Sequence, residues 1–314
     1  MKLIGITIGI IIAVAVIFFI SRHRSASIES RNYNYYVNLC VPLSESKPFN
    51  PEDLARAFKE MWGIAVICAD DNELGRKFRR TRCNESLEAN LKGYVISEGV
   101  DKNNLLLAWN SKPLSKERTE VLVQASDRGF TNRQIISVPG ISSLRNHKAY
   151  FDLDYIRGPD DPKERMLFTA KLLLTLSKRY PVCGYVDSSA QSYTPLPSYP
   201  SGIFDKREIT LTDLFRLFVN VQTISGTTDT EIHTHGMDQF WLPDLQIICP
   251  EEELSRDFDV LRNAAIYMIH KGRPLEVGGT GELAGDGRLF KIAAIKPDDQ
   301  HPFGFYGAIS LRRQ

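Results

Sequence analysis

The sequence has few cysteines and no pairing pattern among them. The five are scattered, odd in number and form no C-x-x-C pair: Cys40, Cys68, Cys83, Cys183 and Cys249. This spacing argues against both a zinc ribbon and a disulfide framework. It is typical of a protein in a reducing compartment. Cys68 and Cys183 also fall in apolar stretches, where we expect unreactive thiols.

The sequence also has no excess of charge of one sign. It contains 39 basic and 38 acidic residues, a formal net charge of +1. A nucleic-acid-binding domain is normally strongly basic, so we expect no nucleic-acid partner. One local segment, Gly75–Arg82, is rich in Arg and Lys and could meet anionic lipid or phosphate. Acidic residues surround it, however, which favours a solvated face.

Two motifs of common enzyme classes are missing. There is no Gly-x-Ser-x-Gly elbow, so nothing supports a serine hydrolase. The glycine-rich stretch Gly278–Gly287 contains a Gly-x-Gly-x-x-Ala string, but its later glycines oppose the helix that a dinucleotide site requires. This stretch therefore predicts a flexible hairpin or loop.

The N-terminus carries one long hydrophobic run. Leu3–Ile20 contains a single polar residue, Thr7, and as a helix it would span about 27 Å, close to the hydrocarbon thickness of a bilayer. A cleaved signal peptide would have a shorter apolar core and a small-x-small site. Here Ser-Arg-His-Arg follows at once. We therefore expect an uncleaved transmembrane anchor, with the lipid bilayer as its partner.

Basic residues beside this run predict its orientation. Arg22, Arg24 and Arg31 follow it, whereas only Lys2 and the terminal amine precede it. The positive-inside rule then favours a cytoplasmic C-terminal domain. The expected location is the inner (plasma) membrane, with a single pass.

The rest of the chain predicts an α+β fold. Two β-α-β-type units are expected: strand 35–41, a helix from Pro51 ended by Gly63, and a buried strand 63–69; then strand 148–156, helix 160–180 and strand 182–186. Further strands are expected at 92–97, 105–109 and 120–124. Frequent hairpins indicate mainly antiparallel sheets with packed helices.

The C-terminal part repeats the mixture of helices and strands. We expect a helix at 212–221 capped by Thr210 or Thr212, a strand at 245–249, a helix from Glu251 to Lys271, and strands near 289–295 and 303–311. The predicted organisation is therefore an anchor (1–24), a tether (25–34), an N-terminal lobe (35–191), a Pro-rich linker (192–202) and a C-terminal lobe (203–314).

The most distinctive motif is His233-Thr234-His235. Residues two apart in a strand face the same side, so both imidazoles would point together and could hold zinc or iron with a third ligand. An amidohydrolase barrel needs more chain than follows His235. Zinc isopeptidases have Pro directly after the pair and Ser further on, where this chain has Gly236 and Pro243.

The third ligand is not indicated by spacing. His147 and His301 are candidates, as are the carboxylates Glu231 and Asp238. The simpler interpretation is a structural strand whose histidines form hydrogen bonds inside the fold, followed by a turn at Gly236. The same stretch is a candidate groove, formed by Gly236, Met237, Trp241 and Asp244.

The motif resembles one known group of proteins. His233-Thr234-His235-Gly236-Met237, followed by Pro243-Asp244-Leu245, is similar to the signature of uncharacterised bacterial domains of unknown function, which carry His-Thr-His-Gly-Met/Leu and then Pro-Glu/Asp-Leu-Glu. Trp241 and Gln246 depart from that pattern, which has a small and an acidic residue there. The likeness extends over most of residues 35–311. It implies a cytoplasmic bacterial domain, accessory or immunity-like, and no particular chemistry.

These observations predict a single-pass, membrane-anchored bacterial protein. We expect its cytoplasmic domain to bind a protein partner without catalysis and without a cofactor, because no complete catalytic set is present. The alternative is a metal-dependent hydrolase that uses zinc or iron on His233 and His235.

Overall fold

The computed structural model describes residues 37–70, 91–99, 102–126, 138–195, 208–283, 285, 287–295 and 306–314. Within these ranges no helix is long and apolar enough to cross a membrane. The expected anchor Leu3–Ile20, the tether, the basic segment Gly75–Arg82 and His301 lie outside them. Residues 37–314 belong to one compact unit.

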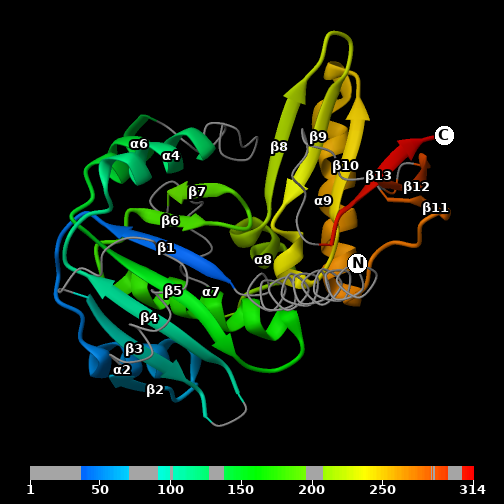
Figure 1. The fold of residues 1–314 in the computed structure, drawn as a ribbon. Coiled ribbons are helices and arrows are strands. Elements are labelled where there is room, and N and C mark those ends of the chain that lie inside the picture. Colours follow the sequence, from blue (N-terminus) through cyan, green and yellow to red (C-terminus); the bar gives the residue numbers. More distant parts are fainter. Residues whose placement is uncertain are drawn as a thin grey trace, which may run out of the picture. The chain divides into compact units, whose positions relative to one another are not determined.

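The first half of this unit is built on a seven-stranded antiparallel sheet (Figure 1). Its strand order is β2-β3-β4-β5-β1-β6-β7. The strands are β1 (Asn38–Leu43), β2 (Ile67–Asp70), β3 (Leu91–Ser97), β4 (Asn104–Asn110), β5 (Ala149–Arg157), β6 (Gly184–Asp187) and β7 (Ser192–Pro195). Both expected β-α-β units are present, but the two strands of each unit are not neighbours in the sheet. Strands β3, β4 and β5 lie between β1 and β2, and strand β1 lies between β5 and β6.

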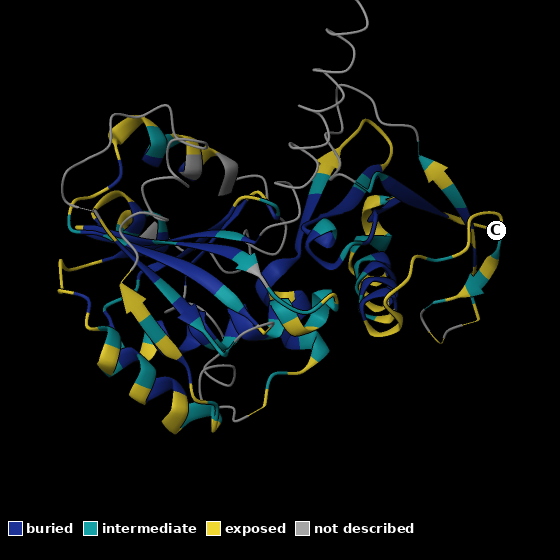
Figure 2. Ribbon diagram, turned by 60° about the horizontal axis from the view of Figure 1, so that its bottom comes forward, coloured by how far each residue is buried: buried dark blue, intermediate teal, exposed yellow. Residues whose placement is uncertain are grey.

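Helices pack against this sheet. Helix α2 (Pro51–Trp62) packs on α7 (Pro162–Arg179), whereas α4 (Lys116–Ser126) contacts β7 and α6 (Val138–Arg145). Both α2 and α7 begin as the sequence predicts: Asn50 accepts a hydrogen bond from the Asp53 amide, Asp161 accepts one from Lys163, and a proline opens each helix. Figure 2 shows buried strands and helices with exposed outer faces.

The second half is a six-stranded sheet in the order β11-β12-β13-β10-β9-β8. Its strands are β8 (Asn220–Ser225), β9 (Thr230–His235), β10 (Asp244–Cys249), β11 (Thr280–Glu282), β12 (Leu289–Ile295) and β13 (Ala308–Arg313). Only the β10–β13 pair is parallel. Helix α9 (Leu254–Lys271) packs on β9 and β10, and α8 (Leu211–Phe218) packs on α9 and α7. The α+β class with antiparallel sheets is therefore confirmed.

Three local expectations were wrong. The segment 120–124 is helical, because Ser115 caps α4 by accepting a hydrogen bond from the Arg118 amide, a signal that outweighs the β-branched valines. The strand predicted at 63–69 is short and is not buried: among the described strands β2 lies at the edge of the sheet beside β3, and Ile67 is exposed. Ser192–Pro195, assigned to the linker, forms the buried edge strand β7.

Candidate functional site

The two histidines lie on β9, in the middle of an antiparallel triplet. Strand β9 pairs with β8 on one side and with β10 on the other. Alternation along the strand puts Glu231, His233 and His235 on one face and Ile232 and Thr234 on the other. Both histidines are only 4% exposed. The prediction that the two imidazoles share a face is confirmed.

The imidazoles contact each other directly. His233 Nε2 and His235 Nε2 are 3.2 Å apart, and the two rings are perpendicular. On its other side His233 Nδ1 lies 2.9 Å from Glu231 Oε1. A carboxylate at this nitrogen favours a proton on Nδ1, which leaves Nε2 with its lone pair directed towards His235.

Burial decides the charge state of His235. Loss of solvent, together with a smaller effect of the neighbouring His233 and against an opposite effect of Glu231, lowers the pKa of His235 to about 3. His235 is therefore a neutral imidazole at physiological pH. A neutral imidazole is the form that binds metal ions, and it is also a hydrogen-bond donor and acceptor.

Side-chain amides surround the pair on the same sheet face. In the ladder, Asn220 of β8 is opposite His235, and His233 is flanked by Gln222 of β8 and Gln246 of β10. All three amides are buried. Both polar atoms of the Asn220 side chain are buried and have no hydrogen-bond partner within the described part of the chain. Such buried polar atoms normally contact an ordered water, an ion or a ligand.

The candidate groove residues have structural contacts. Gly236 has φ +104°, and a Cβ there would lie 2.2 Å from the Phe218 carbonyl oxygen, so only glycine fits this turn. Met237 is fully buried. Asp244 accepts hydrogen bonds from the Thr234 hydroxyl at 2.9 Å and from the Met237 amide at 3.3 Å. The Arg165 guanidinium lies 4.8 Å from the Trp241 ring centroid.

Two of the other candidate ligands are engaged elsewhere. His147 accepts a hydrogen bond from the Leu114 amide at 2.8 Å, and its Nδ1 is 2.6 Å from the Leu144 carbonyl oxygen, so its ring joins two backbone segments. Asp238 accepts a hydrogen bond from the Ser189 hydroxyl. Among the described residues, no three His, Cys, Asp or Glu side chains form a group that could hold a metal.

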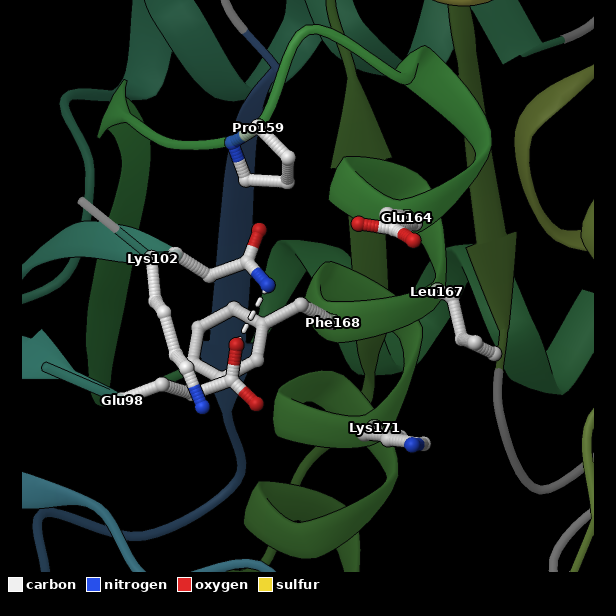
Figure 3. Close-up of a pocket in the computed structure, with 8 residues that line it drawn as sticks. Glu98, Lys102, Pro159, Glu164, Leu167, Phe168 and Lys171 are labelled. Carbon is white, nitrogen blue, oxygen red and sulfur yellow. Dashed lines mark hydrogen bonds between the residues drawn. The ribbon is translucent and has the colours of Figure 1, made fainter.

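A pocket that the sequence reasoning missed lies between the β3–β4 turn and α7 (Figure 3). It has a volume of about 330 Å³ and is open on one side. Its walls carry two acids and two bases, Glu98, Lys102, Glu164 and Lys171, around the apolar Leu167 and Phe168. The signal in the sequence was the spacing of Glu164, Leu167, Phe168 and Lys171, which places them on one helical face.

Within the pocket, burial and hydrogen bonding organise the charged groups. The Asn103 amide donates a hydrogen bond to the Glu98 carboxylate and so holds that side chain in place. Partial burial lowers the pKa of Lys171 from its usual value, an effect that Glu98 partly opposes. A partly desolvated lysine gains more from a bound anion than a fully hydrated one.

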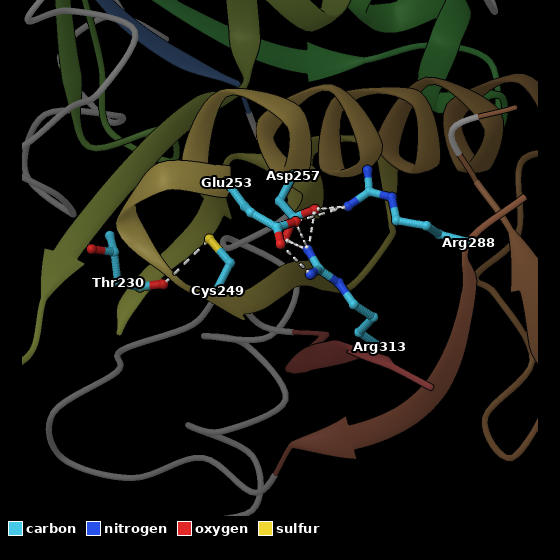
Figure 4. Close-up of polar contacts among 6 residues, drawn as sticks. All are labelled: Thr230, Cys249, Glu253, Asp257, Arg288 and Arg313. Atoms are coloured by element: carbon cyan, nitrogen blue, oxygen red, sulfur yellow. Dashed lines mark hydrogen bonds and ion pairs between the residues drawn. The ribbon is translucent and has the colours of Figure 1, made fainter. Parts of the chain in front are cut away.

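A second polar cluster, also missed, joins the end of the chain to α9 (Figure 4). Arg313 of β13 donates hydrogen bonds to Glu253 and, at 2.9 and 3.1 Å, to both oxygens of Asp257. Arg288 donates to the same Asp257 at 2.6 Å. Asp257 is 1% exposed, and two guanidinium groups compensate its charge, so we interpret this cluster as structural.

Raised pKa values support the expected inertness of Cys68 and Cys183 and extend it to Cys40 and Cys249. Burial raises the pKa of Cys183 and of Cys249 to about 11, that of Cys68 to about 12, and that of Cys40 well above its usual value. None of these four is a candidate nucleophile.

Comparison with known proteins found no match to this chain. No family model matches the chain, and no curated protein and no solved structure is similar to it.

Proposed function

We propose that this chain is a membrane-anchored bacterial protein whose cytoplasmic domain binds a protein partner without chemistry. The observation that carries the proposal is the open pocket between the β3–β4 turn and α7, where four charged side chains surround an apolar floor. Protein interfaces commonly combine an apolar centre with a charged rim. The mixed charges favour a partner segment that presents both a carboxylate and a basic group beside an apolar side chain.

The membrane part of the proposal rests on the sequence. The apolar run Leu3–Ile20 and the arginines that follow it support a single pass with the domain on the cytoplasmic side. A cysteine introduced at the exposed Ser225 tests this orientation. A membrane-impermeant maleimide should label it only after the cells are permeabilised, whereas labelling of intact cells would contradict a cytoplasmic domain.

The partner is tested by site-specific photo-crosslinking of the full chain in its own membranes. A photoreactive amino acid at Leu167, which lines the pocket, should give one discrete crosslinked protein. The same amino acid at the exposed Val277, which is not among the pocket residues, is the matched control and should give none. Reversal of charge by Lys171→Glu should abolish the Leu167 product if the pocket recognises a carboxylate.

Two results would overturn the proposal. One is an equal pattern of crosslinks from both positions, which would mean that the pocket has no preferred partner. The other is a crosslink that persists unchanged in Lys171→Glu together with hydrolase activity of the purified chain.

A further inference from the structure

Two ring nitrogens lie close together on the buried face of β9. The Nε2 atoms of His233 and His235 are 3.2 Å apart. A zinc ion lies about 2.0–2.1 Å from each imidazole nitrogen, and an ion at that distance from both atoms would subtend an N–Zn–N angle of roughly 100°. This angle is close to tetrahedral. The two side chains therefore already stand at the separation that one metal ion requires.

The third residue of this face orients the first ligand. Glu231 Oε1 is 2.9 Å from His233 Nδ1. Histidines that bind metals usually donate the hydrogen of their other nitrogen to a carboxylate or a carbonyl, which fixes the tautomer and makes the binding nitrogen more basic. Glu231 lies within reach of His233 Nδ1 for this role, although the two atoms are not aligned as a hydrogen bond in this structure.

Asn220 is an independent observation that points to a bound species. It is opposite His235 in the β8–β9 ladder, so its side chain is on the histidine face. It is 3% exposed, and neither its amide nitrogen nor its amide oxygen has a hydrogen-bond partner among the residues that the structure describes. A water bound to a metal at the histidine pair would donate a hydrogen bond to the Asn220 amide oxygen.

We propose that His233 Nε2 and His235 Nε2 bind one divalent transition-metal ion, with Asn220 facing a water in an open coordination position. Imidazole nitrogens select zinc, copper or nickel over magnesium or calcium. Within the described residues the protein supplies two ligands, so the remaining positions belong to solvent or substrate. This site is separate from the pocket at α7 and does not rest on the partner-binding proposal.

The first test measures zinc binding by the full chain, purified in detergent, freed of any tag and stripped with a chelator. We expect one equivalent of zinc by equilibrium dialysis. His235→Gln should weaken binding at least about 100-fold, and Glu231→Gln by about 10- to 100-fold, because the carboxylate acts through His233. His270→Gln, an exposed histidine on α9, is the matched control and should bind as the wild type does.

The second test needs no variant, so it stands even if His235→Gln fails to fold. X-ray absorption of the zinc-loaded wild-type chain should show two imidazole nitrogens at about 2.0–2.1 Å and light oxygen ligands for the rest. Absence of stoichiometric zinc overturns the proposal. In that case the two histidines are joined only by an Nε2–H···Nε2 hydrogen bond. A bound ion without two imidazoles overturns it too. Crosslinking from Leu167 in the metal-free chain tests partner binding by itself. A crosslinked product without zinc binding would overturn the metal site and leave the partner-binding proposal standing.

Discussion

The side-chain amide of Gln239 donates a hydrogen bond of 2.9 Å to Asp187 Oδ2, although the two residues are 52 positions apart. Gln239 belongs to the short 3-10 helix η2 (Met237–Phe240), which follows the histidine strand, and Asp187 ends β6 of the first sheet. Asp187 also accepts hydrogen bonds from the amides of Ser189 and Ala190. A single buried carboxyl group therefore joins the histidine turn to the first sheet.

This carboxyl group makes the stability of the protein depend on pH. Burial raises the pKa of Asp187 to about 7, against smaller opposite effects of its hydrogen bonds. The folded chain thus holds one more proton than the unfolded chain between pH of about 4 and 7, and its free energy of unfolding falls as pH rises through that window. Asp187→Asn removes the titration. The free energy of unfolding of Asp187→Asn minus that of the wild type should therefore rise by on the order of 4 kcal/mol between pH 4 and pH 8.

Urea unfolding at several pH values checks this prediction. The exposed Ser225→Ala, which changes no ionisable group, is the control, and its difference from wild type should not change over the same window. A constant difference between Asp187→Asn and wild type would contradict a raised pKa at Asp187.

Gly236→Ala should destabilise the protein strongly. The residue has φ +104°, and the new Cβ would meet the Phe218 carbonyl oxygen at 2.2 Å, so the backbone must move. We expect the free energy of unfolding to fall by at least about 3 kcal/mol, because backbone strain and steric overlap act together. Gly272→Ala, at φ +63° with nothing within 4 Å of the Cβ, should lose only about 1 kcal/mol. Equal losses in thermal unfolding would show that the Phe218 contact is unimportant.

Arg313→Ala should weaken the attachment of β13 to α9. The change removes two hydrogen bonds from the buried Asp257, which keeps the hydrogen bond from Arg288. We expect the free energy of unfolding to fall by about 2 kcal/mol, because the buried Asp257 carboxylate then lacks one of its two guanidinium partners. Arg145→Ala, which breaks the exposed pair with Glu120, should have a much smaller effect. Chemical denaturation of both variants distinguishes them, and similar losses would contradict a special role of burial at Asp257.

His147→Ala should cost stability without any effect on metal binding. Its ring accepts a hydrogen bond from the Leu114 amide and contacts the Leu144 carbonyl oxygen, and both backbone groups would lose their partner. The expected loss is about 2–3 kcal/mol. Zinc binding at saturating zinc, measured where the variant is still folded, should equal that of the wild type. A loss of zinc stoichiometry would place His147 at the metal instead.

The thiols should be slow to react in the native chain. In a Cys83→Ser variant the remaining cysteines are Cys40, Cys68, Cys183 and Cys249, whose pKa values are all raised by burial. At pH 8 a thiol with a pKa of about 11 is about one-thousandth thiolate. A colorimetric disulfide reagent should therefore detect four thiols after denaturation and almost none before it. Rapid reaction of any thiol in the native variant would contradict this.

Local sequence signals predicted many elements. Asn50, Pro51 and Gly63 delimit α2, and Gly272 ends α9 in a left-handed conformation, because capping and backbone preferences act over a few residues. The strand at 289–295 was predicted with its observed bounds. The shared face of His233 and His235 also followed, since alternation is a property of the strand itself.

The sequence by itself therefore determined most of the elements, the fold class and the shared face of β9 on which the two histidines lie. Only the tertiary structure decided that Asn220, Gln222 and Gln246 surround the histidines, and that residues of α7 and the β3–β4 turn enclose a pocket. It also decided that Asp187 and Asp257 are buried with partners far along the chain. The physical reason is that strand order and the packing of helices depend on contacts between distant segments, which no local spacing encodes.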